Sequence, residues 1–274
     1  MEDTLSGPLS LPGAATAEAP SAAIPAFLIT LARRRDRRER FLRWNSGKGI
    51  DFAVFDAVDG RTLNRRGLLD AGLIDDEKLN FTDGQFGNAL SHRALWERCS
   101  ALGRPILVFE DDAFVAETVP QWFARIADEL AQGCDILYLG YNRDALLSVG
   151  FGGGEWCNIV FQTPAAGFEY HARQHSWWSR RNTHCVLDTR LVWGTLAYAV
   201  SPAGAETLLR HCLPLSNKHP VRMFGSGTML TPYGMDGMIN VAVQRGLVKA
   251  RVVFPPLAIG PNDHADSDTL ARPG

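Results

Sequence analysis

One short stretch constrains the fold more than any other part of the sequence: a fully apolar run, residues 106–109, leads directly into three consecutive carboxylates. These carboxylates belong to Glu110, Asp111 and Asp112. Because burying an unpaired charge is very costly, they must lie at the carboxyl end of a buried strand rather than inside it. That edge of an open α/β sheet is where ligands bind.

Side chains alternate along an extended chain, so Glu110 and Asp112 would point to one side and Asp111 to the other. Two carboxylates on one side suit a divalent cation such as Mg²⁺ or Mn²⁺, which takes oxygen ligands. The same side chains could instead cap the following turn or pair with arginines. The triplet by itself is compatible with both interpretations.

Arginines are concentrated in a second short stretch. The 274 residues include 28 basic and 30 acidic ones, so no overall positive charge attracts the chain to nucleic acid or an anionic membrane. Seven arginines nevertheless fall between Arg33 and Arg43. Arginine suits bidentate contacts with phosphate, although a solvated helix face would look the same. Any anion site must therefore be local.

Short apolar runs alternate with amphipathic ones along most of the chain. We expect strands at residues 26–31, 52–55, 106–109, 136–139, 196–200 and 252–254. We expect helices at residues 36–44, 85–102, 122–130, 202–211 and 236–244. Apolar strands that alternate with helices are typical of a mainly parallel sheet covered on both faces. The sequence thus predicts an α/β fold with a single, mainly parallel, Rossmann-type sheet flanked by helices.

The composition divides the chain into three parts. Residues 1–25 are rich in Ala, Pro, Ser and Gly and lack the positive start of a secretory signal, so we expect a disordered leader. We expect residues 26–260 to form one domain, within which residues 141–193 are an insertion. The insertion carries four tryptophans, which could contact a ligand or pack the loop: Trp156, Trp177, Trp178 and Trp193. Residues 261–274 are polar and read as a flexible tail.

The cysteines and the hydropathy of the sequence favour a particular cellular compartment for the protein. The five cysteines are widely spaced and contain no C-x-x-C pair, which excludes a disulfide framework and a zinc knuckle. No run of about 18 apolar residues is present, so we expect no transmembrane segment. We expect a cytoplasmic protein, either free or peripherally associated with the inner face of the membrane.

Several motifs occur in a characteristic order. The first ones are Phe27-Leu28-Ile29-Thr30-Leu31, Arg34-Arg35-Asp36-Arg37-Arg38, Ala57-Val58-Asp59-Gly60, Gly84-Gln85-Phe86-Gly87, and Leu90-Ser91-His92 with Trp96. The later ones are Val108-Phe109-Glu110-Asp111-Asp112, Gly194-Thr195-Leu196-Ala197-Tyr198, Ser201-Pro202 with Gly204-Ala205, and Met235-Asp236. With these motifs the chain, from about residue 26 to residue 258, resembles glycosyltransferase family 25. That family contains bacterial lipooligosaccharide galactosyltransferases and the catalytic domain of collagen galactosyltransferases.

The resemblance implies a GT-A fold, a nucleotide-sugar donor that is most often UDP-galactose, a divalent metal (Mn²⁺ or Mg²⁺) and inversion at the anomeric carbon. Glu110, Asp111 and Asp112 then look like the counterpart of the Asp-x-Asp motif. Asp112 is the first candidate for a metal ligand and Glu110 the second, whereas Asp111 would face the neighbouring loop or the sugar. His264 is a third candidate for the metal, with a solvated loop histidine as the alternative.

The resemblance also suggests a set of donor-binding residues: Thr30, Arg34, Arg37, Arg38, Asp59, Ser91, His92, Asp111, Gly194 and Thr195. Thr30 is a departure, because the family usually has Asn there. Each role has a structural alternative: the arginines could be solvated, Asp59 could cap its turn, and His92 could be a core histidine. Gly194 would let the backbone approach the ligand closely.

Inversion by direct displacement needs a base that deprotonates the acceptor hydroxyl. Asp236, which opens a predicted helix, is our candidate, and its alternative role is a helix N-cap. The expected function is metal-dependent transfer of a hexose from a UDP-sugar to a hydroxyl of a surface glycan or lipooligosaccharide-type acceptor. The insertion at residues 141–193 would lie on the acceptor side of this catalytic domain, where its tryptophans could stack on a sugar. A catalytically inactive sugar-nucleotide or glycan-binding module is the alternative. A phosphotransferase is a third hypothesis, and the missing G-x-x-x-x-G-K-[ST] loop excludes its P-loop version.

Overall fold

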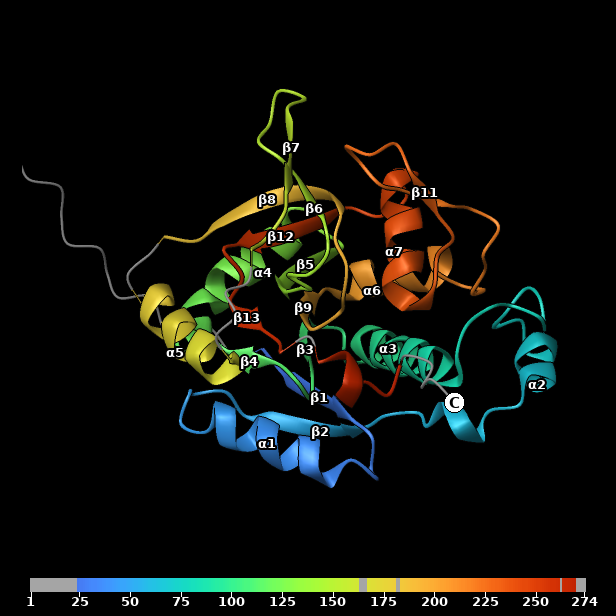
Figure 1. Cartoon of the computed structure of the whole chain (residues 1–274), viewed down its shortest axis with the longest axis horizontal. Coiled ribbons are helices and arrows are strands. Elements are labelled where there is room, and N and C mark those ends of the chain that lie inside the picture. Colours follow the sequence, from blue (N-terminus) through green and yellow to red (C-terminus); the bar gives the residue numbers. More distant parts are fainter. Residues whose placement is uncertain (1–23, 163–166, 181–182, 262, 270–274) are drawn as a thin grey trace, which may run out of the picture.

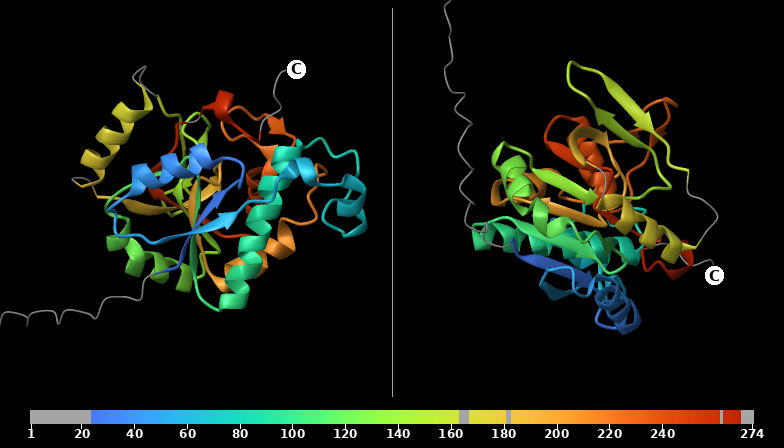
Figure 2. Two further views of the ribbon diagram at one scale, coloured as in Figure 1. Left: turned by 90° about the horizontal axis from the view of Figure 1, so that it is seen from below. Right: turned by 90° about the vertical axis from the view of Figure 1, so that its left-hand side faces the viewer.

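The computed structural model describes residues 24–162, 167–180, 183–261 and 263–269, apart from the side chains of residues 169–171 and 177–178. Of the leader expected at residues 1–25, only Ile24 and Pro25 lie within the described part. Figure 1 shows a central sheet with helices around it, and Figure 2 shows the same arrangement from two further sides.

The centre of the described chain is one large sheet. Its strands are β1 (Ala26–Thr30), β2 (Phe52–Asp56), β3 (Ile106–Glu110), β4 (Phe114–Val115), β5 (Ile136–Gly140), β6 (Leu147–Gly150), β7 (Trp156–Ile159), β8 (Cys185–Leu191), β9 (Ala197–Val200), β12 (Ala250–Phe254) and β13 (Ala258–Ile259). They follow the order β2-β1-β3-β9-β5-β12-β8-β6-β7, and β13 pairs with both β4 and β5. A separate two-stranded sheet consists of β10 (Val221–Arg222) and β11 (Met229–Leu230).

Most strands at the centre run in one direction. β1 is parallel to β2 and β3, and β5 is parallel to β12. β9 lies between β3 and β5 and is antiparallel to both, so these two strands share the direction of β1. The predicted fold class, an α/β protein with a mainly parallel sheet, is confirmed, and the reversed strand β9 is the detail that the pattern did not reveal.

Helices cover both faces of the sheet. The α-helices are α1 (Arg35–Asn45), α2 (Arg65–Asp70), α3 (Asp83–Leu102), α4 (Phe123–Ala131), α5 (Phe168–Ser179), α6 (Pro202–His211) and α7 (Gly234–Gln244). Short 3₁₀ turns are η1 (Gly60–Thr62), η2 (Val119–Trp122) and η3 (His264–Asp266). Helices α3, α6 and α7 pack against one another on one face, and α1 and α4 contact the other.

Strand β3 shows why the sheet needs two apolar layers. Ile106 and Val108 belong to the core shared with α3 and α6, whereas Leu107 and Phe109 belong to the core shared with α1 and α4. All four are fully buried. A strand buried on both faces reads as a continuous apolar run, because alternate side chains enter opposite cores. The first polar residues after the run therefore mark the edge of the sheet.

Residues 141–193, expected as an insertion, continue the sheet. Strands β6 and β8 add to the edge next to β12, and β7 pairs with β6 as a hairpin that stands out from the body of the molecule in Figure 1. The pattern did not reveal β7 and β8, because β7 is largely exposed and β8 contains three consecutive polar residues, Asp188, Thr189 and Arg190. In the described part of the chain, no helix combines the length and the apolar character that crossing a membrane requires.

Candidate active site

The ends of β1 and β3 and the beginning of α1 meet at one point on the carboxyl edge of the sheet. β1 and β3 are parallel neighbours, so the residues that follow them lie side by side. Oγ1 of Thr30 donates a hydrogen bond of 2.7 Å to Oδ2 of Asp111. Nε of Arg37 donates to Oδ1 of the same carboxylate at 2.6 Å, and its Nη2 lies 3.2 Å from Oδ2 of Asp112. Two carboxylates thus share one buried guanidinium.

Asp112 retains an unused oxygen. Its Oδ1 is buried and has no hydrogen-bond partner among the described residues, although the residue as a whole is partly exposed. Burial raises the pKa of Asp112 to about 6, Arg37 opposes this shift, and the neighbouring carboxylates add to it. Burial also raises the pKa of Asp111, again against the effect of Arg37. An unpaired carboxylate oxygen of this kind can accept a cation or a hydrogen-bond donor from a ligand.

Glu110 is held by three donors. Oε1 accepts hydrogen bonds from Thr195 Oγ1 at 2.6 Å, from Asn88 Nδ2 at 3.2 Å and from His92 Nε2 at 3.2 Å. Burial acts to raise the pKa of Glu110, but the hydrogen bonds, with His92 first among them, bring the pKa below its ordinary value. Glu110 is therefore stabilised as a carboxylate, and its position is fixed both from the segment before β9 and from α3.

A buried relay orients His92. The Tyr198 hydroxyl accepts a hydrogen bond of 3.0 Å from Trp96 Nε1 and lies 2.9 Å from His92 Nδ1. Since the hydroxyl has only one proton to give, the geometry assigns it to Nδ1 and leaves Nε2 of His92 as the donor to Glu110. His92 is fully buried, so in this structure it supports Glu110 from behind rather than facing a ligand.

Asp236 lies on α7 and is joined to the Glu110 network through two consecutive residues. Gly194 N donates to Oδ2 of Asp236 at 2.9 Å, while the next residue, Thr195, holds Glu110. Gly237 N donates to Oδ1 of Asp236 at 2.8 Å. Burial nevertheless raises the pKa of Asp236 to about 6, because these hydrogen bonds only partly compensate. The side chain is not the N-cap of α7, since that position belongs to Tyr233.

The backbone at Gly194 requires glycine. Its φ is +83°, in the left-handed region, and a Cβ built there would lie 2.3 Å from Oδ1 of Asn142. Asn240 fixes the preceding turn, because its amide accepts from Val192 N at 3.0 Å and donates to Val192 O at 2.7 Å. These contacts hold the backbone N–H of Gly194 in line with Asp236.

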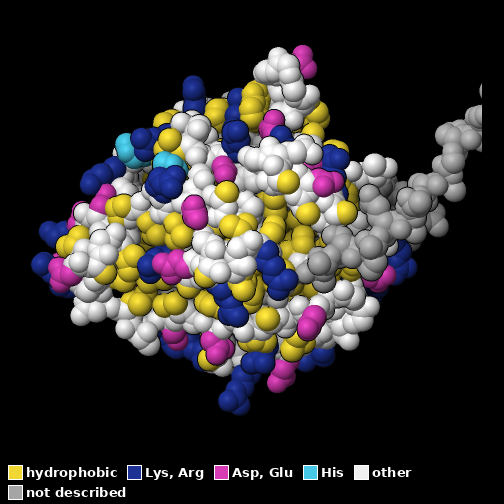
Figure 3. All heavy atoms as spheres, turned by 180° about the vertical axis from the view of Figure 1, so that it is seen from behind, with side chains coloured by type: hydrophobic (Ala, Val, Ile, Leu, Met, Phe, Trp, Pro, Cys, Tyr) yellow, Lys and Arg dark blue, Asp and Glu magenta, His cyan; other side chains and the backbone are white. Residues whose placement is uncertain are grey.

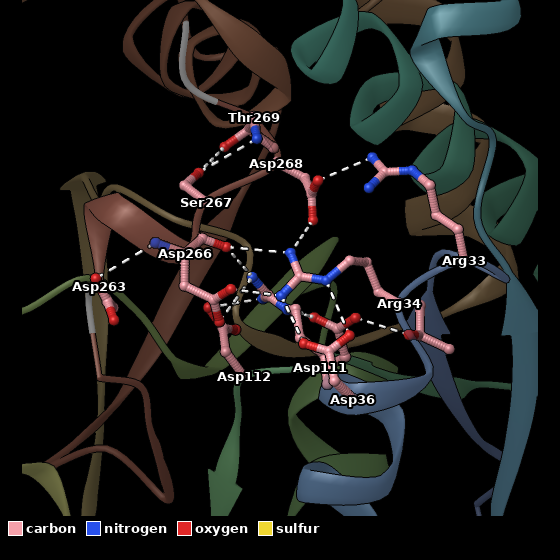
Figure 4. A network of polar contacts seen from close by, with 12 residues as sticks. Arg33, Arg34, Asp36, Asp111, Asp112, Asp263, Asp266, Ser267, Asp268 and Thr269 are labelled. Atoms are coloured by element: carbon pink, nitrogen blue, oxygen red, sulfur yellow. Dashed lines mark hydrogen bonds and ion pairs between the residues drawn. The ribbon is translucent and has the colours of Figure 1, made fainter. Parts of the chain in front are cut away.

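The other arginines of the cluster between Arg33 and Arg43 differ in their surroundings. Arg33 and Arg34 turn toward the carboxylates of Asp266 and Asp268, which come from a distant part of the chain (Figure 4). Arg38 is exposed on the outer face of α1, which agrees with the alternative interpretation of a solvated arginine. Elsewhere, basic and acidic side chains are interspersed on the face seen in Figure 3, which fits a local rather than a general anion site.

Two further predicted donor-binding residues serve the local structure. Asp59 accepts from Arg61 and Arg33, which hold its pKa well below the usual range, and it caps η1 through Arg61 N. Ser91 is fully buried, donates to Gly87 O at 2.7 Å and accepts from Val58 N at 2.9 Å. Ser91 thereby ties α3 to the segment after β2 and presents no surface to a ligand.

His264 lies apart from the other two metal candidates. It is largely exposed and its Nε2 is 3.0 Å from Oδ2 of Asp144. Within the described residues, no group of three or more His, Cys, Asp or Glu side chains is arranged to hold a metal ion. The fit for a metal rests on the free oxygen of Asp112 with Glu110 beside it, a set that would need oxygens from the substrate to complete it.

Aromatic residues lie next to Asp236. Trp193 and Tyr233 stack with ring centroids 5.6 Å apart and an interplanar angle of 17°, and Tyr233 is half-exposed. On the β6–β7 hairpin, Trp156 is exposed beneath the guanidinium of Arg190. The side chains of Trp177 and Trp178 lie outside the described residues. The exposed rings offer flat apolar faces of the kind on which sugars stack.

Sequence reasoning missed some of the residues that shape the site. Asn88 lies on the same helix as His92, four residues earlier, so helical spacing could have pointed to it. Tyr198 gave no such signal, since its strand reads as uniformly apolar. Asp266 and Asp268 could have been noticed as acidic residues with alternate spacing, but nothing local relates them to arginines more than 200 residues away.

A family model and curated relatives both relate this chain to one family of glycosyltransferases. The model of a family described as "Glycosyltransferase family 25 (LPS biosynthesis protein)" matches residues 23–223. The human protein named "Inactive glycosyltransferase 25 family member 3" is 30% identical over 212 residues, which cover 71% of this chain and 31% of that protein. "Procollagen galactosyltransferase 1-A" of Xenopus laevis is 33% identical over 128 residues, covering 43% of this chain and 21% of that protein.

This chain thus spans less than a third of the length of these curated relatives. Among solved structures, a mannose-1-phosphate geranyltransferase from Thermus thermophilus aligns with a TM-score of 0.32 at 16% identity, covering 85% of this chain and 58% of that one. A TM-score this low does not establish a shared fold.

Proposed function

The chain belongs to glycosyltransferase family 25, and from this premise we propose that it transfers a hexose from a UDP-sugar to a hydroxyl of a surface glycan or lipooligosaccharide-type acceptor. Galactose is the first candidate for the hexose, because one relative is named a galactosyltransferase. The description of the family model, an LPS biosynthesis protein, supports a surface-glycan acceptor.

One observation carries this proposal: two carboxylates with different roles are held by consecutive residues, Gly194 on Asp236 and Thr195 on Glu110. Asp236 is partly exposed and has a pKa of about 6, so near pH 7 it is mostly ionised and still basic enough to take a proton. We assign it the role of the base that deprotonates the acceptor hydroxyl as the hydroxyl attacks the anomeric carbon.

The diphosphate of the donor would lie against Arg34 and Arg37, whose guanidiniums offer bidentate donors. Asp112 and Glu110 would hold Mn²⁺ or Mg²⁺, which neutralises charge on the leaving diphosphate when it is bound. Thr30 and Arg37 keep Asp111 in a fixed position beside these groups. The stacked pair Trp193 and Tyr233 then forms a wall for the acceptor next to Asp236.

The free cysteine thiols support the proposal that the protein works in a reducing compartment. All five cysteines are unpaired, and three of them are buried. Cysteines that all remain free thiols are typical of a protein in the cytoplasm. We propose that the protein works there, at the inner face of the membrane when the acceptor is a glycolipid.

An inactive binding module remains the alternative, and the relative named inactive favours it. The two functions differ in turnover and share donor binding. A thermal-shift screen should therefore compare UDP-galactose, UDP-glucose, UDP-N-acetylglucosamine and GDP-sugars with Mn²⁺, since only ligands that bind the native state raise its stability.

The second half of the experiment measures release of UDP from the best donor, with water serving as a slow acceptor. We expect stabilisation by UDP-galactose and UDP release that Asp236→Asn abolishes. Stabilisation with no UDP release from the wild type, at any donor concentration, would favour the binding module. If no nucleotide-sugar stabilises the protein, the transferase and the sugar-nucleotide-binding module are both wrong.

A further inference from the structure

An acidic segment lies across the arginines to which the donor diphosphate was assigned. We call residues 263–269 the acidic strap. It contains η3 and passes between α1 and the amino end of α3 (Figure 1). Figure 4 shows its carboxylates beside Arg33 and Arg34. The sequence suggested a flexible tail for residues 261–274, yet the described part of that segment makes close polar contacts with the site.

The acidic strap contacts four guanidiniums through two carboxylates and one backbone carbonyl. Asp268 lies 2.8 Å from Nη2 of Arg33 and 2.5 Å from Nη1 of Arg34. Asp266 forms an ion pair with Arg34 and lies 2.9 Å from Nη2 of Arg40. Its backbone carbonyl accepts a hydrogen bond of 2.9 Å from Arg37. Because arginine has no acceptor atoms, each of these donors needs an anion or a carbonyl once it leaves water.

The surface beneath the acidic strap makes close contacts with it at both ends. Oγ1 of Thr82, at the start of α3, donates a hydrogen bond of 2.5 Å to the carbonyl of Thr269. A Cβ built at Gly84 would lie 1.9 Å from the carbonyl oxygen of Asp268, so the strap packs where any larger residue would collide. At the other end, His264 is bound to Asp144. These contacts tie the strap down at both ends over the site.

The bound strap and a bound diphosphate would use the same donors. The strap places two carboxylates on the Arg34 guanidinium and a backbone carbonyl on the Arg37 guanidinium, and a diphosphate would place its oxygens on the same two groups. Arg34 is only 12% exposed and Asp268 only 15%, which leaves little room for a second anion between them. A ligand must therefore replace the carboxylates rather than add to them.

We propose that the acidic strap is an exchangeable counterion of the arginine cluster, which the diphosphate of a nucleotide-sugar displaces. The proposal rests on the proposed function only for the identity of the displacing ligand. A small anion such as pyrophosphate gains no contacts beyond those that the strap already makes, whereas a nucleotide gains further contacts through its nucleoside. The strap thereby makes the site selective for complete nucleoside diphosphates over free phosphate and pyrophosphate.

The test compares pyrophosphate and UDP binding by calorimetry in the wild type and in the double variant Asp266→Asn with Asp268→Asn. The matched control, Asp70→Asn with Glu97→Gln, removes two negative charges from exposed ion pairs within single helices. We expect pyrophosphate to bind at least tenfold more tightly to the strap variant, a smaller gain for UDP, and wild-type values for the control. Equal pyrophosphate affinity in the wild type and the strap variant would overturn the proposal.

A second variant separates displacement from a change of charge. Gly84→Ala adds a methyl group where the strap packs, leaves the net charge unchanged and suits a helix. We expect it to tighten pyrophosphate binding in the same direction as the strap variant. Pyrophosphate affinity at the wild-type level or below in Gly84→Ala would mean that charge alone explains the first result, and the displacement would be wrong.

Hydrogen exchange follows the strap directly. In the wild type, saturating UDP should accelerate exchange of the amides of residues 263–269, because the displaced strap returns to water. Slower exchange would show a lid that closes over the nucleotide, and unchanged exchange would show a fixed wall; either result contradicts the proposal. If UDP-sugars fail to bind at all, the proposed function fails, while the pyrophosphate comparison still decides the role of the strap.

Discussion

Gly194 and Thr195, neighbours in the chain, each donate a hydrogen bond to a different carboxylate: Gly194 N to Asp236 at 2.9 Å and Thr195 Oγ1 to Glu110 at 2.6 Å. The first carboxylate has a pKa raised by burial, and the second has a pKa lowered by its donors. Two neighbouring titratable groups whose environments shift their pKa values in opposite directions are typical of acid–base sites. The relationship leads to two predictions about Asp236.

Asp236→Asn should remove the base while keeping its shape. The amide can still accept a hydrogen bond from Gly194 N, so donor affinity should stay within about twofold of the wild type. Transfer should fall by about 10²-fold or more, on the scale expected for loss of a general base. Steady-state rates combined with calorimetry of UDP-galactose check both quantities; unchanged turnover would reduce Asp236 to a structural residue of α7.

The rate should depend on pH through the same group. Because the pKa of Asp236 is raised to about 6, its basic form predominates above that pH and is lost as the pH falls. At saturating donor and Mn²⁺ we expect kcat to be constant above about pH 7 and to fall about tenfold for each pH unit below 6. A kcat that stays constant down to pH 4.5 would exclude Asp236 as the base.

The relay behind Glu110 provides a pair of matched substitutions. Tyr198→Phe leaves Trp96 Nε1 and His92 without their buried partner, which should cost about 3 kcal/mol of unfolding free energy. The control is Tyr138→Phe on the neighbouring strand, because the Tyr138 hydroxyl is buried without a partner among the described residues. Its removal should be neutral or stabilising by about 1 kcal/mol. Urea denaturation of both variants measures the two unfolding free energies. Equal losses in the two variants would contradict the hydrogen bonds assigned to the Tyr198 hydroxyl.

A second buried amide fixes the loop that carries Asp112. Asn45 on α1 donates to Ala113 O at 2.9 Å, accepts from Val115 N at 2.9 Å and also accepts from Lys48 Nζ. Asn45→Ala should therefore cost about 3 kcal/mol, since several buried groups lose a partner at once. The control Asn64→Ala removes only the exposed cap of α2 and should cost about 1 kcal/mol. Similar losses in the two variants would be inconsistent with this network.

The sequence predicted those features that depend on local pattern. The strand and helix positions around 106–109 and 85–102 follow from apolar runs and helical spacing, and the structure confirms both. The break from apolar to acidic residues also placed Asp111 and Asp112 correctly at the edge of the sheet, because buried charge is costly anywhere in a chain. Such rules need no knowledge of distant partners.

The remaining features depend on contacts between distant residues. The contact of Thr30 with Asp111 spans 81 positions, and that of Arg34 with Asp268 spans 234. The reversed direction of β9 is equally hidden, because a buried strand looks the same in sequence whichever way it runs. His92 shows the limit most clearly: its type suggested ligand contact, whereas its burial gives it a supporting role.

We propose that the edge of the sheet at Asp112 binds a nucleoside diphosphate together with a divalent cation. Calorimetry of UDP binding, with and without Mn²⁺, in the wild type and in Asp112→Asn tests this claim. We predict at least tenfold tighter binding of UDP when Mn²⁺ is present, and loss of that dependence in Asp112→Asn. UDP that binds the wild type equally well after removal of all divalent metal would contradict the claim.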